Sequence, residues 1–199
     1  MELSEPEEPR KLWPRDHSDE HHIPMVPRSL WLDARRSYEA EIYVGAILLA
    51  ALAAESGLRE YLKVYILRKF GKDAAEFINA HLLEEMDFRR LATMCERLGL
   101  LKFIITDLHK IYNVRTKYAH VKIMPILGEL AEEDVTVHES DASGKIVDHY
   151  KVKDDDFLTS AIVFGKAEED SWGVLEKTYN VLKVIFMQSG YWRGQEGQP

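Results

Sequence analysis

The run IYVGAILLAALAA, residues 42–54, decides the fold because it is the longest stretch of the chain without a charged residue. Its thirteen residues are too few for a membrane-spanning helix, which needs about 20. The run therefore predicts a buried helix and no membrane partner. A helix that is apolar almost all round is covered on more than one side, either by other helices of the chain or by a second subunit.

A long helix is expected to extend from this run in both directions. No proline lies between Trp31 and Phe70, and apolar residues recur at helical spacing across this range. Ser29 or Asp33 is a suitable N-cap for a helix that starts near Trp31. The pair Ser56-Gly57 is expected to kink or split the helix, since a glycine there costs about 1 kcal/mol relative to alanine.

Further helices are predicted along the rest of the chain. Gly71 is expected to end the long helix. Helical spacing of apolar residues then predicts a short helix over 73–81, a second from near 87 to 99, a third over 101–121 and a last one over 172–188.

The apolar spacing changes between the last two of these helices. Val135 to Val137 and Ile146 to Val152 have the composition of strands, and residues 141–144 between them have that of a turn. These segments predict a β-hairpin at about 134–153. The expected fold class is therefore all-α in the main, a helical bundle with a small inserted β-hairpin.

The chain is expected to form a single helical domain over residues 29–189. Residues 1–28 hold five of the seven prolines, so they are predicted to form an irregular arm. Residues 190–199 are predicted to be a disordered tail. The single cysteine, Cys95, and the lack of an apolar signal segment predict a reducing, cytoplasmic location.

Charge is distributed unevenly along the chain. The formal net charge is −8, which excludes a strongly basic protein that coats nucleic acid with its whole surface. Residues 31–125 carry twelve acidic and fifteen basic side chains, whereas residues 126–170 carry thirteen acidic and four basic ones. The acidic segment is either a solvated surface or a shield for a basic surface nearby.

The sequence contains none of the common metal or cofactor motifs. No histidine has a glutamate three residues before it, as a di-metal helical bundle requires. Residues 16–22 hold three histidines and three acids, but in a flexible arm without preformed geometry. There is no Cys-x-x-Cys, phosphate-binding loop or Gly-x-Ser-x-Gly motif. We therefore predict no metal site and no cofactor.

The segment IYNVRTKYAHV, residues 111–121, is the strongest candidate for chemistry. Arg115 lies four residues after Ile111 and seven after Leu108, which places it on the apolar stripe of the predicted helix. A guanidinium there needs a partner, because burying an unpaired charge is costly. That partner is a carboxylate, such as Glu55 or Glu60, or the phosphate of a ligand.

Arg115 and His120, with four residues between them, resemble the signature of the HEPN superfamily, an arginine followed after four to six residues by a histidine late in a core helix. Residues 111–114, the pair Tyr118-Ala119 and the alanine-rich run ending in an acid at Glu55 are also similar to that family. The resemblance covers roughly residues 31–122. Thr116 departs from it, since many members carry Asn, Asp or His directly after the arginine.

The resemblance implies a metal-independent endoribonuclease that acts as a homodimer, with Arg–His pairs of both subunits lining one cleft. His120 would transfer a proton at the 2′-hydroxyl or the leaving oxygen, and Arg115 would bind the scissile phosphate. Residues five apart on a helix point about 140° apart, so the two side chains share one phosphate only if the last turn distorts or the partner subunit contributes. A toxin or defence effector that cleaves RNA, with an antitoxin as partner, is the expected setting.

Four further residues are expected to support this site. Asn113 and Thr116 share the face of His120 and would orient its ring. Lys117 and Tyr118 are predicted to contact RNA. The alternative is a non-catalytic HEPN-like module that dimerises or binds a nucleotide or a partner protein; Arg115 would then pair with an internal acid, and His120 would cap the helix.

Overall fold

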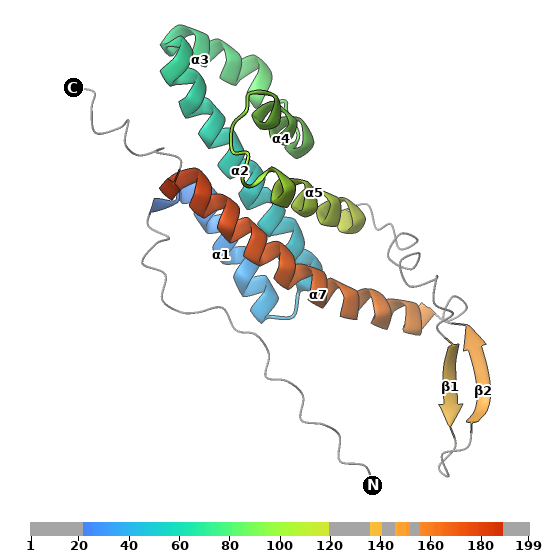
Figure 1. Cartoon of the computed structure of the whole chain (residues 1–199). Coiled ribbons are helices and arrows are strands. Elements are labelled where there is room, and N and C mark those ends of the chain that lie inside the picture. The colour runs from blue at the N-terminus through green and yellow to red at the C-terminus, as the bar shows by residue number, and fades with distance from the viewer. Residues whose placement is uncertain (1–21, 120–135, 141–145, 152–155, 189–199) are drawn as a thin grey trace.

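The computed structural model describes residues 22–119, 136–140, 146–151 and 156–188 of the chain. These residues are mainly helical, as the sequence predicts. Two long helices, α2 (Tyr43–Phe70) and α7 (Asp156–Lys183), pack against each other, and Figure 1 shows α1 (Met25–Glu39) beside them. The predicted tail over 190–199 and most of the predicted arm lie outside the described residues.

Helix α1 begins earlier than the sequence predicts. Its N-cap is Pro24, and neither Ser29 nor Asp33 caps it. Pro27 lies in the first turn of α1. The missing backbone N–H costs nothing there, because the residue four positions earlier lies before the helix and its carbonyl is not part of the helical hydrogen-bond pattern. Residues 25–28, expected to belong to the irregular arm, therefore form the start of α1, and Ile23 just before it is buried in the core.

The predicted single helix from Trp31 to Phe70 is in fact two helices. The chain turns at residues 40–42, where Glu41 adopts a φ of 62° and the amide of Ile42 donates to the carbonyl of Ser37 at 2.8 Å. Tyr38 and Tyr43 pack their rings together across this turn, with centroids 5.6 Å apart. No glycine or proline marks the turn, which explains why the sequence prediction missed it.

Gly57 neither kinks nor splits α2, contrary to the sequence prediction. It lies inside the continuous helix Tyr43–Phe70 and is buried. A Cβ atom at this position would lie 2.7 Å from Cδ2 of Leu182 and 3.5 Å from the ring of Phe186. The glycine therefore allows the C-terminal end of the chain's last helix to approach α2 closely.

The middle of the chain follows the predicted order of short helices. They are α3 (Lys72–Ile78), the π-helical turn η2 (Asn79–Leu83), α4 (Phe88–Arg97) and α5 (Ile105–Ala119). Gly71 ends α2 and Gly99 follows α4, both with positive φ. Asp87 caps α4 by accepting a hydrogen bond from the amide of Arg90 at 2.8 Å. Helix α5 starts later than predicted because Leu101 has a φ of 54°.

Helix α7 starts at Asp156, well before the predicted Trp172, and continues into the π-helical turn η4 (Val184–Gln188). Its buried face includes small or polar residues such as Ala167 and Ser171. Because such residues give only a weak helical pattern of hydrophobicity, the sequence did not predict the first part of this helix. Before α7 in the chain, strands β1 (Thr136–Ser140) and β2 (Ile146–Lys151) pair antiparallel.

The run 42–54 forms the centre of the core. Its residues Ala46, Ile47, Ala50, Ala51, Ala53 and Ala54 are fully buried. Helices α1, α5 and α7 of the same chain pack against α2, whereas Ile42, Val44 and Leu52 of this run are exposed. None of the helices in the described ranges combines the length and apolar composition that crossing a membrane requires.

Candidate functional site

Arg115 pairs with Glu55, one of the two carboxylates that the sequence analysis offered as its partner. Nη1 of Arg115 donates to Oε2 of Glu55 at 3.2 Å, joining α5 to α2. The side chain of Glu55 is 13% exposed and that of Arg115 is 28% exposed. Glu60, the other predicted partner, instead lies 3.6 Å from Lys63.

Glu55 holds a second arginine with its other oxygen. Nη2 of Arg59 lies 3.0 Å from Oε1 of Glu55. Arg59 also donates from Nε to the carbonyl of Leu83 at 3.1 Å and from Nη2 to that of Met86 at 2.9 Å. The sequence analysis missed Arg59, although its position four residues after Glu55 is the ordinary spacing of a helical ion pair.

One carboxylate between two guanidinium groups leaves a net positive charge. Arg59 makes three hydrogen bonds, in which Nε and Nη2 donate to Glu55 and to two backbone carbonyls. Among the described residues, Arg115 makes a side-chain hydrogen bond only to Glu55, and a guanidinium has five N–H donors. Arg115 is therefore held in place while most of its donors stay available for an anion.

The residues predicted around Arg115 have different environments. Asn113 is exposed, and Lys117 is half-buried. The hydroxyl of Thr116 donates to the carbonyl of Tyr112 at 2.9 Å, so its hydrogen is used within the helix. His120, the predicted proton-transfer group, lies outside the described residues.

Tyr118, which the sequence predicts to contact RNA, joins two helices in the structure. Its side chain is buried, with 5% exposure. Its hydroxyl donates to Oδ2 of Asp170 at 2.9 Å, which links α5 to α7. A ring this deeply buried offers little surface for stacking on a nucleotide base.

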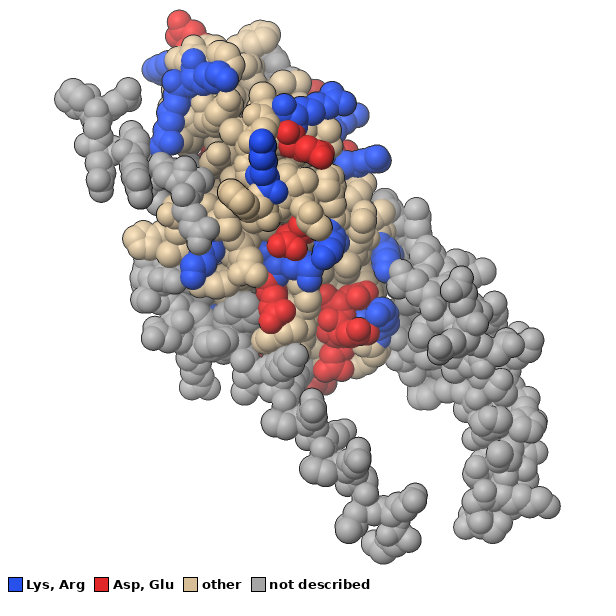
Figure 2. All heavy atoms as spheres, in the orientation of Figure 1, with Lys and Arg blue, Asp and Glu red and all other residues tan. Residues whose placement is uncertain are grey.

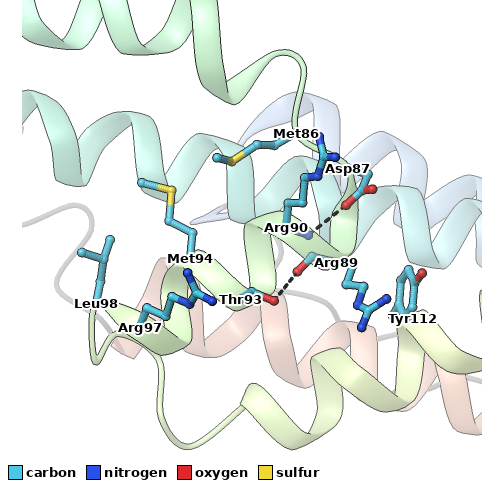
Figure 3. Close-up of a pocket in the computed structure, with 9 residues that line it drawn as sticks. All are labelled: Met86, Asp87, Arg89, Arg90, Thr93, Met94, Arg97, Leu98 and Tyr112. Carbon is cyan, nitrogen blue, oxygen red and sulfur yellow. Dashed lines mark hydrogen bonds between the residues drawn. The ribbon is translucent and has the colours of Figure 1, made fainter.

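A hollow of about 670 Å³ lies along α4. Arg89, Arg90 and Arg97 line it from α4, and Tyr112 lines it from α5 (Figure 3). Leu98 is 41% exposed and also lines this hollow. Lys and Arg side chains gather around the α4 end of the face shown in Figure 2. The sequence analysis missed the hollow because its lining comes from two helices.

One hydrogen bond and one helical spacing relate the hollow to the Arg115 cluster. The carbonyl of Met86, which lines the hollow, accepts the hydrogen bond from Arg59. Tyr112 precedes Arg115 by three residues on α5 and so lies on a neighbouring part of the same face. Residues that line the hollow therefore lie close to the cluster along the chain or bind to it through the backbone, although Arg115, Glu55 and Arg59 do not line the hollow.

The described side chains provide no obvious alternative chemistry. In the parts of the chain that the structure describes, no three His, Cys, Asp or Glu side chains are grouped so that they could hold a metal ion. Cys95 is buried, and that burial raises the pKa of its thiol to about 12. At neutral pH it is a neutral thiol and a poor nucleophile.

Comparison of the chain with family models, with curated proteins and with solved structures finds no match.

Proposed function

We propose that this protein is a metal-independent endoribonuclease with an HEPN-like helical bundle, in which the β1–β2 hairpin is an insertion. It acts as a homodimer whose Arg115 and His120 residues line a shared cleft. It works in the cytoplasm as a toxin or defence effector, and a partner protein such as an antitoxin restrains it. The proposal rests on the resemblance of residues 111–121 to the HEPN signature.

The observation that carries the proposal is the state of Arg115. Its guanidinium is fixed by Glu55 at 3.2 Å, yet its side chain keeps 28% exposure. A fixed, partly exposed guanidinium is well suited to binding a scissile phosphate and to stabilising the negative charge that grows on it. Its position five residues before His120 matches the spacing of the family signature.

The chemistry follows from the two side-chain types. The 2′-hydroxyl of the RNA attacks the adjacent phosphate, a proton leaves this hydroxyl, and a proton reaches the 5′-oxygen that departs. His120 transfers a proton in this exchange, since its unperturbed pKa near 6.5 suits neutral pH. Arg115 binds the phosphate oxygens, and the product carries a 2′,3′-cyclic phosphate. No metal ion is needed for these steps.

The same ion pair also supports a second candidate function. Arg115 paired with Glu55 satisfies a half-buried charge, as a purely structural arginine would be satisfied. In this alternative the protein is a non-catalytic HEPN-like module that dimerises or binds a nucleotide or a partner protein. The two candidates differ in whether RNA is cut.

The decisive experiment is cleavage of mixed cellular RNA in EDTA by the full chain. We expect wild type to cut RNA to products with 2′,3′-cyclic phosphate ends. His120→Ala and Arg115→Lys should lose this activity, the latter because lysine keeps the charge for Glu55 but not the planar fork. Arg36→Lys serves as the matched control, because Arg36 is 75% exposed on α1 and pairs only with nearby Asp33 among the described residues. Absence of cleavage by wild type, or equal cleavage by the His120 variant, would overturn the proposal in favour of the non-catalytic module.

A further inference from the structure

The hollow along α4 is lined by three arginines. Arg89, Arg90 and Arg97 are exposed. Within the described ranges, the side chains of these three arginines form no hydrogen bond and no ion pair. Asp87, the acid of the hollow, is engaged as the N-cap of α4. In a chain of net charge −8, an arginine-lined hollow of this kind indicates a site for an anion.

The arginines are spread along the helix and do not converge on one point. Arg89 and Arg97 are eight residues apart on α4, which corresponds to about 12 Å along the helix axis. In Figure 3, Arg89 lies at the end beside Tyr112, and Arg97 lies at the opposite end beside Leu98. A spacing of about 12 Å covers three to four steps of a stacked strand at about 3.4 Å per nucleotide. The arrangement fits a row of phosphates better than a single one.

The rest of the lining suits flat apolar groups. Tyr112 is half-buried, and its ring is held edge-on by buried Phe88, with centroids 6.2 Å apart and an interplanar angle of 80°. Met94 and Leu98 add apolar surface to the lining. A fixed aromatic ring beside a row of arginines is the combination by which proteins bind single strands, with bases stacked and phosphates paired.

One end of the hollow is close to Arg115 along α5. Tyr112 lies one helical turn before Arg115 on α5, and Arg59 links Glu55 to the backbone of Met86 at the edge of the hollow. A strand that lies along α4 and passes Tyr112 therefore comes within about one helical turn of Arg115 on α5.

We propose that the hollow lined by Arg89, Arg97 and Tyr112 binds a single-stranded RNA segment next to the Arg115 site. Arg89 and Arg97 pair with backbone phosphates that lie about three to four nucleotides apart, and Tyr112 stacks on a base. This site guides the strand toward Arg115. The guiding role rests on the proposed ribonuclease function, whereas RNA binding at the hollow does not depend on it.

The test measures binding separately from cleavage. The probe is a fluorescent 12-nucleotide RNA of mixed sequence with 2′-O-methyl groups throughout, which cannot undergo 2′-hydroxyl attack. Its affinity for the full chain is measured by fluorescence anisotropy from 50 to 200 mM salt. We expect Arg89→Gln and Arg97→Gln each to weaken binding on the order of three- to tenfold and to lower the slope of log K against log salt by about 0.7.

Two further variants make the result specific. Tyr112→Leu should weaken binding with an unchanged salt slope, because it removes stacking and no charge. Arg36→Gln, the matched control on α1, should leave affinity and slope unchanged. Thermal unfolding of every variant shows whether the fold is kept, and surface arginine substitutions on α4 are expected to keep it.

The outcomes separate the two proposals. RNA binding that depends on Arg89 and Arg97, with no cleavage of ordinary RNA, supports this site and overturns the ribonuclease. Cleavage by a protein whose affinity is unaffected by these variants supports the ribonuclease and overturns this site. Equal competition by poly-glutamate, with no effect of Tyr112→Leu, would overturn this site in favour of an acidic protein partner.

Discussion

Glu55 in α2 and Arg115 in α5 are sixty residues apart in sequence and form an ion pair of 3.2 Å in the folded protein. The same carboxylate binds Arg59, whose guanidinium reaches two carbonyls in and after η2. One acidic side chain thus connects α2, α5 and the segment before α4. This cluster is both part of the fold and the support of the candidate site.

The Glu55–Arg115 pair should show measurable energetic coupling. Glu55→Ala is expected to lower the free energy of unfolding by about 1–3 kcal/mol, because two half-buried guanidinium groups lose their acceptor. A double-mutant cycle with Arg115→Ala, measured by urea unfolding, should give a coupling of about 1 kcal/mol. The exposed pair Asp33–Arg36 is the control and should give less than about 0.5 kcal/mol. A coupling at Glu55 no larger than that of the control would contradict a structural role for this pair.

Tyr118→Phe should affect stability and leave RNA cleavage intact. The variant removes the hydroxyl that donates to Asp170 at 2.9 Å while keeping the buried ring. The free energy of unfolding is expected to fall by about 1 kcal/mol. Urea unfolding and the cleavage assay in EDTA, run on the same preparation, check both parts. A large loss of cleavage at unchanged stability would restore the predicted contact between Tyr118 and RNA.

Two glycines within helices should respond oppositely to alanine. Gly57→Ala is expected to destabilise by about 1 kcal/mol, because overpacking against Leu182 costs about 1–3 kcal/mol and exceeds the gain in helix propensity. Gly165→Ala is the matched control in α7, where no atom lies within 4 Å of the added Cβ. It should stabilise by about 0.5–1 kcal/mol. Thermal unfolding of both variants measures the difference, and stabilisation by Gly57→Ala would disprove the close approach to Leu182.

The buried thiol of Cys95 should make stability fall at high pH. Burial raises its pKa from 9.0 to about 12, so the folded protein keeps the proton where the unfolded chain releases it. Its contribution is fully present below about pH 9 and is lost as the pH rises toward 12. Relative to Cys95→Ala, wild type is expected to lose about 2 kcal/mol of unfolding free energy between pH 8 and pH 10.5.

Subtracting the alanine variant removes the effects of tyrosines and lysines that titrate in the same range. Urea unfolding at the two pH values gives the comparison. The folded protein should also react slowly with a thiol reagent at pH 8. A difference between the two proteins that does not change with pH would contradict the assignment.

Several features of the fold were predictable because they depend on neighbouring residues. The uncharged run 42–54 predicted a buried helix, and Gly71 predicted the end of α2. Helix α4 starts after Asp87, close to its predicted start, since capping acts over a few residues. The place of Arg115 on an apolar stripe likewise predicted a charged partner from spacing alone.

Other features depend on which helices meet. The turn at residues 40–42 has no glycine or proline, and packing of Tyr38 on Tyr43 accompanies it. The early start of α7 escaped prediction because small and polar residues such as Ala167 and Ser171 form its packing face.

The amino-acid sequence by itself determined that this protein is mainly helical, where its central buried helix lies, and that Arg115 needs an anionic partner. Tertiary structure alone decided that the partner is Glu55, that Tyr118 is buried against α7, and that Tyr112 joins the arginines of α4 in one hollow. The physical reason is direction. Glu55 and Glu60 point about 140° apart on α2, so only the packing of α5 selects between them.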